Sequence, residues 1–249
     1  MSSPFTLSYG AQGLREVVFA PLTGEDERAD PGADALLVRL ARPVPGCVYG
    51  DALVELSTGD RDRALAGLYD ALYGSAIAAD ATCCDCRARF EMHFDLGELA
   101  ERRRPELPCQ GDPPVVALGD SLLRLPRRID LAGSPEALLA QLTISGPVPQ
   151  PEVAAQALEA ADPGLDLDLS TTCPECGKEQ LVPFSIAAFL EATLTRDRAF
   201  LVREVHLIAL SYHWRLEEIL SLSREERHAF VRLLIAEREA ASMSLRRVS

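Results

Sequence analysis

The sequence has 249 residues, 47% of them hydrophobic and 25% charged, which is ordinary for one large or two small globular domains. The formal net charge of −13 disfavours general binding to nucleic acid, which requires a basic face. No apolar run approaches the roughly 20 residues that cross a bilayer, and residues 1–10 show no signal-peptide pattern, so we expect the seven cysteines to sit in a reducing compartment.

Residues 1–50 are predicted to form an N-terminal arm followed by short elements. Weak patterning over 1–14 indicates a loose arm or an edge strand. The elements that follow are a strand at 16–19, a helix entry at 22–27 and a short helix at 33–41. A longer helix is predicted from Asp60, as its cap, to Tyr73, with Gly74 as the C-terminal stop.

Two Cys-x-x-Cys pairs carry the strongest chemical signal. Cys83 and Cys86 repeat as Cys173 and Cys176, and the offset is 90 residues for both members. The same shift places Phe94 on Phe184 and Leu96 on Ile186. The match beyond the cysteines indicates one supersecondary unit that is used twice.

Strand-like runs flank both pairs, at 76–82 and 90–96 in the first unit and at 165–172 and 180–186 in the second. Structural zinc takes four ligands in a tetrahedron, with zinc–sulfur distances of about 2.3 Å. We therefore predict a duplicated zinc ribbon, in which two β-knuckles share one structural Zn²⁺ per chain. The predicted ligands are Cys83, Cys86, Cys173 and Cys176.

The two knuckles differ at the residue that follows the second cysteine. Gly177 suits the positive φ on which such a turn ends, whereas Arg87 implies either strain or another turn. A disulfide framework, a redox Cys-x-x-Cys and an iron–sulfur site are the alternatives for these cysteines. Cys84 either substitutes for a neighbouring ligand or is an idle thiol, and Cys47 and Cys109 are predicted as packing residues.

The full fold prediction is α+β: a duplicated zinc ribbon with flanking helices and an all-α C-terminal region. The predicted domains are 1–50, 51–192 with an insertion at 97–164, and 193–249. Within the insertion we expect a hairpin at 115–125, a helix opened by Ser134-Pro135-Glu136 and a helix at 153–160. The C-terminal helices are predicted at 187–193, 196–214 and 216–220, with a last one that begins in a Ser223 capping box and turns Phe230, Leu233 and Leu234 inward.

Catalytic patterns are weak in this sequence, so we predict a non-enzymatic protein. Four cysteines close a zinc shell, whereas catalytic zinc keeps an open position. No phosphate-binding loop and no Gly-x-Ser-x-Gly sequence occurs. The histidines are scattered and lack a His-Glu-x-x-His arrangement, so we interpret them as packing or surface residues: His93, His206, His213 and His228.

Three stretches together resemble a known protein family. They are Leu56-Ser57-Thr58-Gly59-Asp60-Arg61, Cys173-Pro174-Glu175-Cys176-Gly177, and 201–206 continuing through Tyr212-His213-Trp214 to 218–222. In this order, over about residues 50–236, they resemble the baseplate hub and hub-assembly proteins of contractile phage tails of the T-even type and of related tail-like particles. The chain departs from that pattern at Cys84, at Arg87 and in the 97–164 insertion.

The resemblance implies a structural or chaperone-like protein of a contractile tail baseplate. Its partners would be other baseplate, hub or spike proteins, with no nucleic acid, membrane or small-molecule substrate. It would act in the bacterial cytoplasm during assembly; a permanent subunit and a transient chaperone both fit, as do a phage, a bacteriocin-like tail and an injection device.

The alternative function is a zinc-ribbon nucleic-acid binder, in which arginines gather near the metal. The candidate arginines are Arg87, Arg89, Arg102, Arg103, Arg104, Arg124, Arg127 and Arg128. The scarcity of interleaved aromatic residues and the overall negative charge disfavour this reading.

Overall fold

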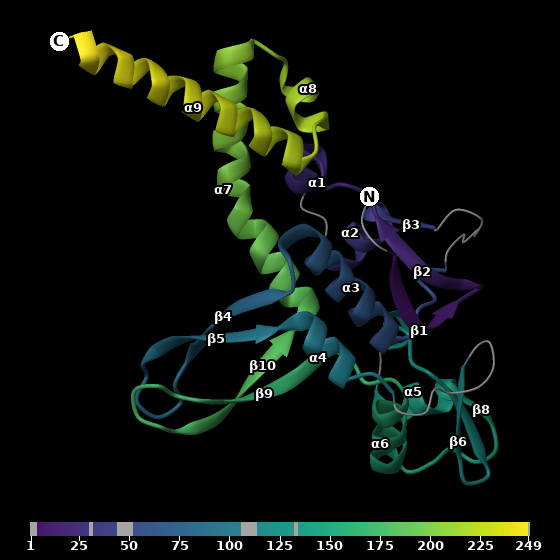
Figure 1. The fold of residues 1–249 in the computed structure, drawn as a ribbon. Helices are drawn as coiled ribbons and strands as arrows, with labels where there is room; N and C mark the ends of the chain where they lie inside the picture. Colours follow the sequence, from purple (N-terminus) through teal and green to yellow (C-terminus); the bar gives the residue numbers. More distant parts are fainter. Residues whose placement is uncertain (1–3, 30–31, 44–51, 106–113, 132–133, 249) are drawn as a thin grey trace. The chain divides into compact units, whose positions relative to one another are not determined.

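The computed structural model describes residues 4–29, 32–43, 52–105, 114–131 and 134–248. It is a mixed α+β protein of small antiparallel sheets and helices, which confirms the predicted class (Figure 1). The chain divides into two compact units, one made of residues 1–19 and 37–189 and the other of 20–36 and 190–249. Cys47 and Cys109, predicted as packing residues, lie outside the described residues.

Two three-stranded antiparallel sheets belong to the first unit. One has the order β1-β2-β3 and the other the order β6-β7-β8. Their strands are β1 (Phe5–Ala11), β2 (Leu14–Phe19), β3 (Ala41–Pro43), β6 (Val115–Leu118), β7 (Ser121–Arg124) and β8 (Thr143–Ser145). The predicted hairpin at 115–125 is confirmed, and β1 is an edge strand, one of the two readings of 1–14.

A helix runs directly into the last strand of each sheet. Helix α2 (Ala33–Leu40) precedes β3, and α5 (Pro135–Leu142) precedes β8, with η1 (Arg128–Leu131) before α5. The two helices have equal length, and an offset of 102 residues aligns an Ala-Leu-Leu-x-x-Leu sequence in both. The internal repeat therefore extends beyond the cysteine hairpins, which the offset of the cysteines alone does not reveal.

Each sheet is followed by the same succession of helix, hairpin and helix. In the first copy these are α3 (Thr58–Tyr73), β4 (Ala76–Thr82), β5 (Arg89–Asp95) and α4 (Leu96–Arg102). In the second copy they are α6 (Pro151–Ala161), β9 (Asp166–Thr172), β10 (Glu179–Ser185) and α7 (Ile186–Tyr212). The four hairpin strands match at the offset of 90 residues, with identical register.

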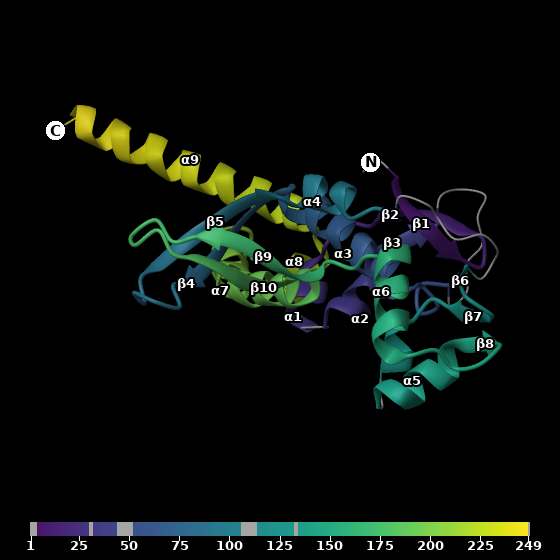
Figure 2. The same ribbon diagram turned by 90° about the horizontal axis from the view of Figure 1, so that it is seen from below.

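The two hairpins lie side by side in both views of the ribbon (Figures 1 and 2). Side chains alternate along the strands, so that Ile77, Ala79 and Ala81 of β4 are buried while their neighbours are exposed. Phe94 and Phe184, which are equivalent in the two copies, meet edge to face with ring centroids 5.1 Å apart. The hairpins thus form a small two-layer sandwich whose tips carry the cysteines.

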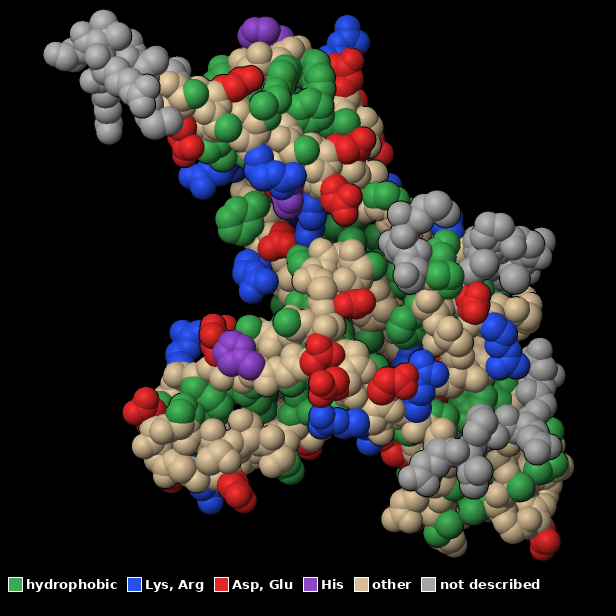
Figure 3. Space-filling view, viewed as in Figure 1, with side chains coloured by type: hydrophobic (Ala, Val, Ile, Leu, Met, Phe, Trp, Pro, Cys, Tyr) green, Lys and Arg blue, Asp and Glu red, His purple; other side chains and the backbone are tan. Residues whose placement is uncertain are grey.

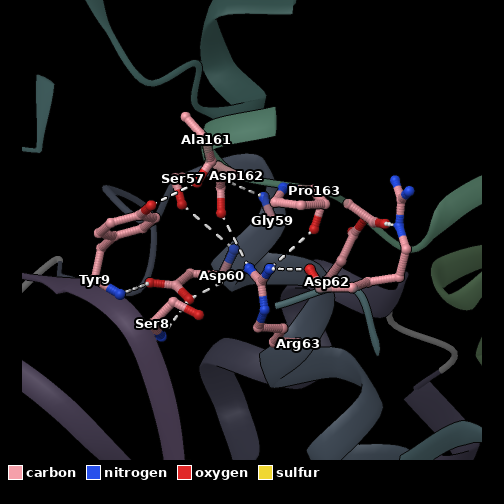
Figure 4. A network of polar contacts seen from close by, with 12 residues as sticks. Ser8, Tyr9, Ser57, Gly59, Asp60, Asp62, Arg63, Ala161, Asp162 and Pro163 are labelled. Carbon is pink, nitrogen blue, oxygen red and sulfur yellow. Dashed lines mark hydrogen bonds and ion pairs between the residues drawn. The ribbon is translucent and has the colours of Figure 1, made fainter. Parts of the chain in front are cut away.

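A buried polar network ties the base of this sandwich together (Figure 4). The Arg63 guanidinium, on α3, lies 3.0 Å from the Asp162 carboxylate and 3.6 Å from that of Asp60. It also donates to the carbonyls of Arg103 and Pro163. One side chain therefore joins the helix that leads into β4, the end of α4 and the turn that leads into β9.

Asp60 was predicted as the cap of α3, and that prediction is wrong. Ser57 caps the helix, because its hydroxyl accepts from the Asp60 N–H. The Asp60 carboxylate accepts three backbone N–H groups of β1 instead, at 2.6–2.7 Å, from Ser8, Tyr9 and Gly10. This buried acid therefore attaches the first sheet to α3, and the predicted stop at Gly74 is confirmed, with φ +83°.

Burial shapes the ionisation of the other acids in this network. Removal from water raises the pKa of both Asp62 and Asp162, although hydrogen bonds oppose the shift. Asp62 accepts the Leu165 N–H at 2.9 Å, one residue before β9 begins. Asp162 in turn accepts the Gly59 N–H at 2.8 Å, so the two acids join the start of α3 to the segment that leads into β9.

The second unit is helical: α1 (Gly24–Ala29), the distal part of α7, α8 (Leu216–Ser221) and α9 (Arg224–Val248). The helices predicted at 187–193 and 196–214 are one continuous helix, because no Gly or Pro interrupts residues 186–212. The Ser223 capping box is confirmed: the Ser223 hydroxyl accepts the Glu226 N–H at 3.3 Å, and the Glu226 carboxylate accepts the Ser223 N–H at 2.8 Å. Leu234 is buried, but Leu233 is 50% exposed, which corrects the prediction for that residue.

Ion pairs hold α9 against its neighbours in the second unit. Arg227, buried to 1% exposure, pairs with Glu204 at 3.0 Å and with Glu27 of α1. The ring of Trp214 packs against those of Tyr212 and Phe230. None of the helices among the described residues has the length and apolar character that a bilayer-spanning helix needs.

The Arg63 network gives a first prediction. Replacing Arg63 with Ala leaves Asp60 and Asp162 buried without their cation, so the free energy of unfolding of the first unit should fall by about 3–5 kcal/mol. Urea unfolding followed by circular dichroism measures this change. The control is Arg102→Ala, which removes an exposed pair with Glu98 and should leave the unfolding midpoint almost unchanged. Equal effects of the two substitutions would contradict the role given to Arg63.

Candidate metal centre

The hairpin tips bring the four predicted ligands into one cluster. Cys83 and Cys86 lie in the β4–β5 turn, and Cys173 and Cys176 lie in the β9–β10 turn. Their four sulfur atoms all lie within 4.8 Å of one another. Cys83 and Cys173 are buried, whereas Cys86 and Cys176 are exposed, so each knuckle contributes one inner and one outer sulfur.

The sulfur distances fit a tetrahedral shell. Sulfurs of opposite knuckles lie 3.6 Å apart for Cys83 and Cys176 and 3.7 Å apart for Cys86 and Cys173. A tetrahedron with metal–sulfur bonds of about 2.3 Å has edges of about 3.8 Å. Both distances greatly exceed the roughly 2.05 Å of a disulfide bond, and the five described cysteines are free. The four cysteines could thus hold a metal ion between them.

The backbone of both knuckles folds in the same way. The Cys83 N–H donates to the Ala88 carbonyl and the Arg87 N–H donates to the Cys83 carbonyl, at 2.9 and 3.2 Å. The equivalent bonds in the second knuckle are both 2.9 Å, from Cys173 to Lys178 and from Gly177 to Cys173. Gly177 has the predicted positive φ, +73°, and Arg87 adopts the same left-handed conformation at +64° rather than another turn.

Backbone N–H groups prepare the inner sulfur of the first knuckle for a negative charge. Hydrogen bonds from the N–H groups of Cys86 and Asp85 lower the pKa of the Cys83 thiol to about 6, although burial opposes them. For Cys86 the N–H of Ala88 favours the thiolate, but hydrogen bonding with Cys176, burial and hydrogen bonding with Cys83 raise the pKa to about 12. The cluster therefore favours a thiolate at Cys83 first, and a bound cation would compensate the charge of the others.

Gln180 links the two knuckles directly. Its side-chain oxygen accepts the Cys84 N–H at 2.8 Å, and its side-chain nitrogen donates to the Thr82 carbonyl at 3.3 Å. The second copy cannot make the reciprocal contact, since the residues at the positions of Gln180 and Cys84 are Phe90 and Pro174. Proline has no N–H to donate.

Cys84 therefore contributes through its backbone. Its thiol is exposed and does not belong to the group of four sulfurs that lie together. Neither Gln180 nor the Cys84 N–H was singled out in the sequence. The signal that would have found them is a break in the repeat: at equivalent positions of the two copies, Gln180 corresponds to Phe90 and Cys84 to Pro174.

The histidines lie apart from the cysteine cluster. His93 is exposed on β5, 3.5 Å from Glu91, and His228 contacts Glu204 at 2.9 Å. His206 is exposed on α7, and His213 follows that helix with φ +56°. Within the described ranges, the four cysteines are the sole group of three or more candidate ligands close enough to share an ion.

Comparison of the chain with protein-family models, with curated proteins and with solved structures found no match.

The two knuckles form a matched pair for a stability experiment. Arg87→Gly should raise the free energy of unfolding by about 1 kcal/mol, because glycine removes the strain of the left-handed conformation. Gly177→Ala should lower it by a similar amount through backbone strain alone, since no atom lies within 4 Å of the added Cβ position. Thermal melts of the two variants at equal metal content give both values. Shifts of the same sign would show that the knuckles do not share one turn.

Proposed function

We propose that Cys83, Cys86, Cys173 and Cys176 hold one structural zinc ion and that the hairpins form a duplicated zinc ribbon. The observation that carries this proposal is the pair of inter-knuckle sulfur distances, 3.6 and 3.7 Å, which match the edge of a tetrahedral thiolate shell. Zn²⁺ accepts four thiolates without a redox change and closes the shell, so no position is left for a substrate or water. The ion would then hold the tips of the two hairpins together and stabilise them, since each hairpin has only two strands.

The alternative uses of these cysteines, as a disulfide, a redox pair or an iron site, have less support than zinc. A disulfide between the knuckles needs sulfurs much closer than the 3.6 Å observed. A redox Cys-x-x-Cys opens a helix after a strand, whereas here a second strand follows each pair. Single iron in a four-thiolate shell has the same geometry as zinc, and metal analysis separates the two.

We further propose that the protein is a non-enzymatic structural or assembly component of a contractile tail baseplate. The support is the order of the stretches at 56–61, 173–177 and 201–222, which resembles that family. In the fold these stretches act as a helix cap, a knuckle and packed helices, with Ser57 capping α3 and with Ile219 and Leu220 buried.

The arginines of the nucleic-acid alternative give that function little support. Five of them pair with carboxylates: Arg102 with Glu98, Arg103 with Glu159, Arg104 with Glu101, and Arg124 and Arg127 with Asp130. On the face drawn in Figure 3, Lys and Arg side chains are dispersed among acidic ones. Paired, dispersed cations do not form the basic stripe that a nucleic acid backbone needs.

Metal analysis tests the zinc proposal. Purified protein should contain about one zinc and no iron per chain by elemental mass spectrometry. Removal of the ion with a chelator should unfold the hairpins, and equimolar zinc should restore them, since binding supplies folding free energy. Cys173→Ser should lose both the metal and the fold, while Cys84→Ser should keep both. Metal-free protein with an unchanged melt would refute the proposal.

Deletion of the gene tests the tail proposal. Cells that lack the protein should produce no complete contractile tails by negative-stain electron microscopy, and the wild-type gene should restore them. Cys173→Ser should fail to complement, whereas Cys84→Ser should complement. Mass spectrometry of the purified particles then shows whether the protein stays in the baseplate. Normal tails in the deletion strain would exclude the proposed role.

A further inference from the structure

The two-layer sandwich of hairpins has two sides along which strand edges lie, one bordered by β5 and β9 and the other by β4 and β10. Among the described residues, β5 pairs only with β4 and β9 only with β10. Every hairpin strand therefore has one free edge. The pseudo-symmetry that exchanges the copies also exchanges the two sides, because it places β5 on β10 and β9 on β4.

The hydrogen bonds at the ladder ends show which residues point their backbone groups outward. The Cys83 N–H donates to Ala88 and the Leu96 N–H donates to Ser75. Since antiparallel pairs alternate between bonded and non-bonded, the N–H and C=O groups of Glu91 and His93 point away from β4. In β10 the same alternation places Pro183 at a position whose backbone points away from β9, and proline has no N–H to offer there.

The side bordered by β4 and β10 is closed. Gln180 of β10 crosses to the Thr82 carbonyl of β4 and to the Cys84 N–H. Pro183 removes a donor from the free edge of β10, a usual means of protecting an edge strand against further pairing. An incoming strand would therefore meet an occupied carbonyl on β4 and a missing N–H on β10.

The side bordered by β5 and β9 lacks all three of these features. Phe90, Pro174 and His93 stand at the positions of Gln180, Cys84 and Pro183. A groove of about 550 Å³ runs along this side, with Phe90, Phe94 and Leu169 among its lining residues. Figure 3 shows apolar side chains in the hollow between the hairpins and a histidine with acidic side chains beside it.

The charge along the groove indicates what it accepts. Three carboxylates line it, those of Glu91, Asp95 and Glu98, against the single guanidinium of Arg102. Arg102 is already paired with Glu98 at 2.8 Å. The other two carboxylates have no Lys or Arg partner among the described ion pairs: Glu91 lies 3.5 Å from His93, and Asp95 caps α4. A cationic side chain that enters the groove would thus meet two carboxylates without a Lys or Arg partner, whereas an acidic one would be repelled.

We propose that the free edge of β5 accepts an extended, basic segment of a partner protein as an added strand. Backbone hydrogen bonds to Glu91 and His93 would give affinity, and alternate side chains of the segment would reach the apolar lining and the acidic rim. The inference does not depend on the tail assignment, because it rests on the difference between the two sides of the sandwich.

Matched proline variants test the proposal. His93→Pro removes an outward N–H from β5, so that β5 then has a proline at the position equivalent to Pro183 of β10. Ala78 lies directly opposite His93, so Ala78→Pro removes the outward N–H of the same ladder pair on the closed side. Both proteins are used at full length, after metal content and circular dichroism have shown that they are folded.

The probe is a fluorescein-labelled decapeptide of alternating lysine and valine, and its binding is measured by fluorescence anisotropy. Wild-type and Ala78→Pro proteins should bind it saturably, and His93→Pro should bind about tenfold more weakly, the effect of one lost hydrogen bond. Hydrogen exchange at the Glu91 and His93 amides should slow when the peptide is bound. Replacement of its lysines by glutamates should abolish binding to wild-type protein.

A peptide methylated at alternate backbone nitrogens tests the same point without any change to the protein. It should fail to bind, because an added strand needs those donors. Lack of saturation at millimolar unmodified peptide, equal binding of the methylated peptide, or equal loss in both proline variants would overturn the proposal. Sedimentation that shows a dimer abolished by His93→Pro would also overturn it, because the occupant would then be a second copy of this chain.

Discussion

The placement of the two hairpins depends on one buried cation. Arg63 is held among Asp60, Asp162 and two carbonyls, and it is 1% exposed. A guanidinium in such a site is stable only when several acceptors are fixed around it at once. Those acceptors come from the ends of α4 and α6 and from the start of α3, which are the segments that lead into or out of the hairpins. The sulfur geometry at the tips is therefore set in part by a polar contact at the base.

The two copies of the hairpin unit are alike in most features and differ at one contact. Both copies use the same knuckle turn, the same strand register and a phenylalanine at the centre of the sandwich. The copies differ where Gln180 meets the first knuckle, because Phe90 and Pro174 cannot make that contact in return. The repeat supplies two equivalent surfaces, and these substitutions leave the one beside β5 and β9 without the Gln180 contact.

Much of this arrangement could be predicted from the sequence, because periodic patterns and fixed spacing are local. The cysteine offset predicted the cluster, and alternating residues predicted the hairpin strands to within one residue at each end. The role of Asp60 could not be predicted that way. A Ser and an Asp three residues apart both suit a helix start, and the choice depends on β1, whose contact lies 50 residues away along the chain. The single helix over 186–212 was predicted as two pieces, 187–193 and 196–214, although no Gly or Pro breaks the backbone between them.

The wide separation of the knuckles in the chain bears on how the protein is made. Cys86 leaves the ribosome 90 residues before Cys176. At a synthesis rate of about 5–20 residues per second, the first knuckle waits roughly 5–20 s for its counterpart. During that interval it offers two cysteine side chains without their counterparts to any metal or oxidant in the cell. The proposed zinc site would thus couple maturation of this protein to the cell's supply of free metal while translation is still under way.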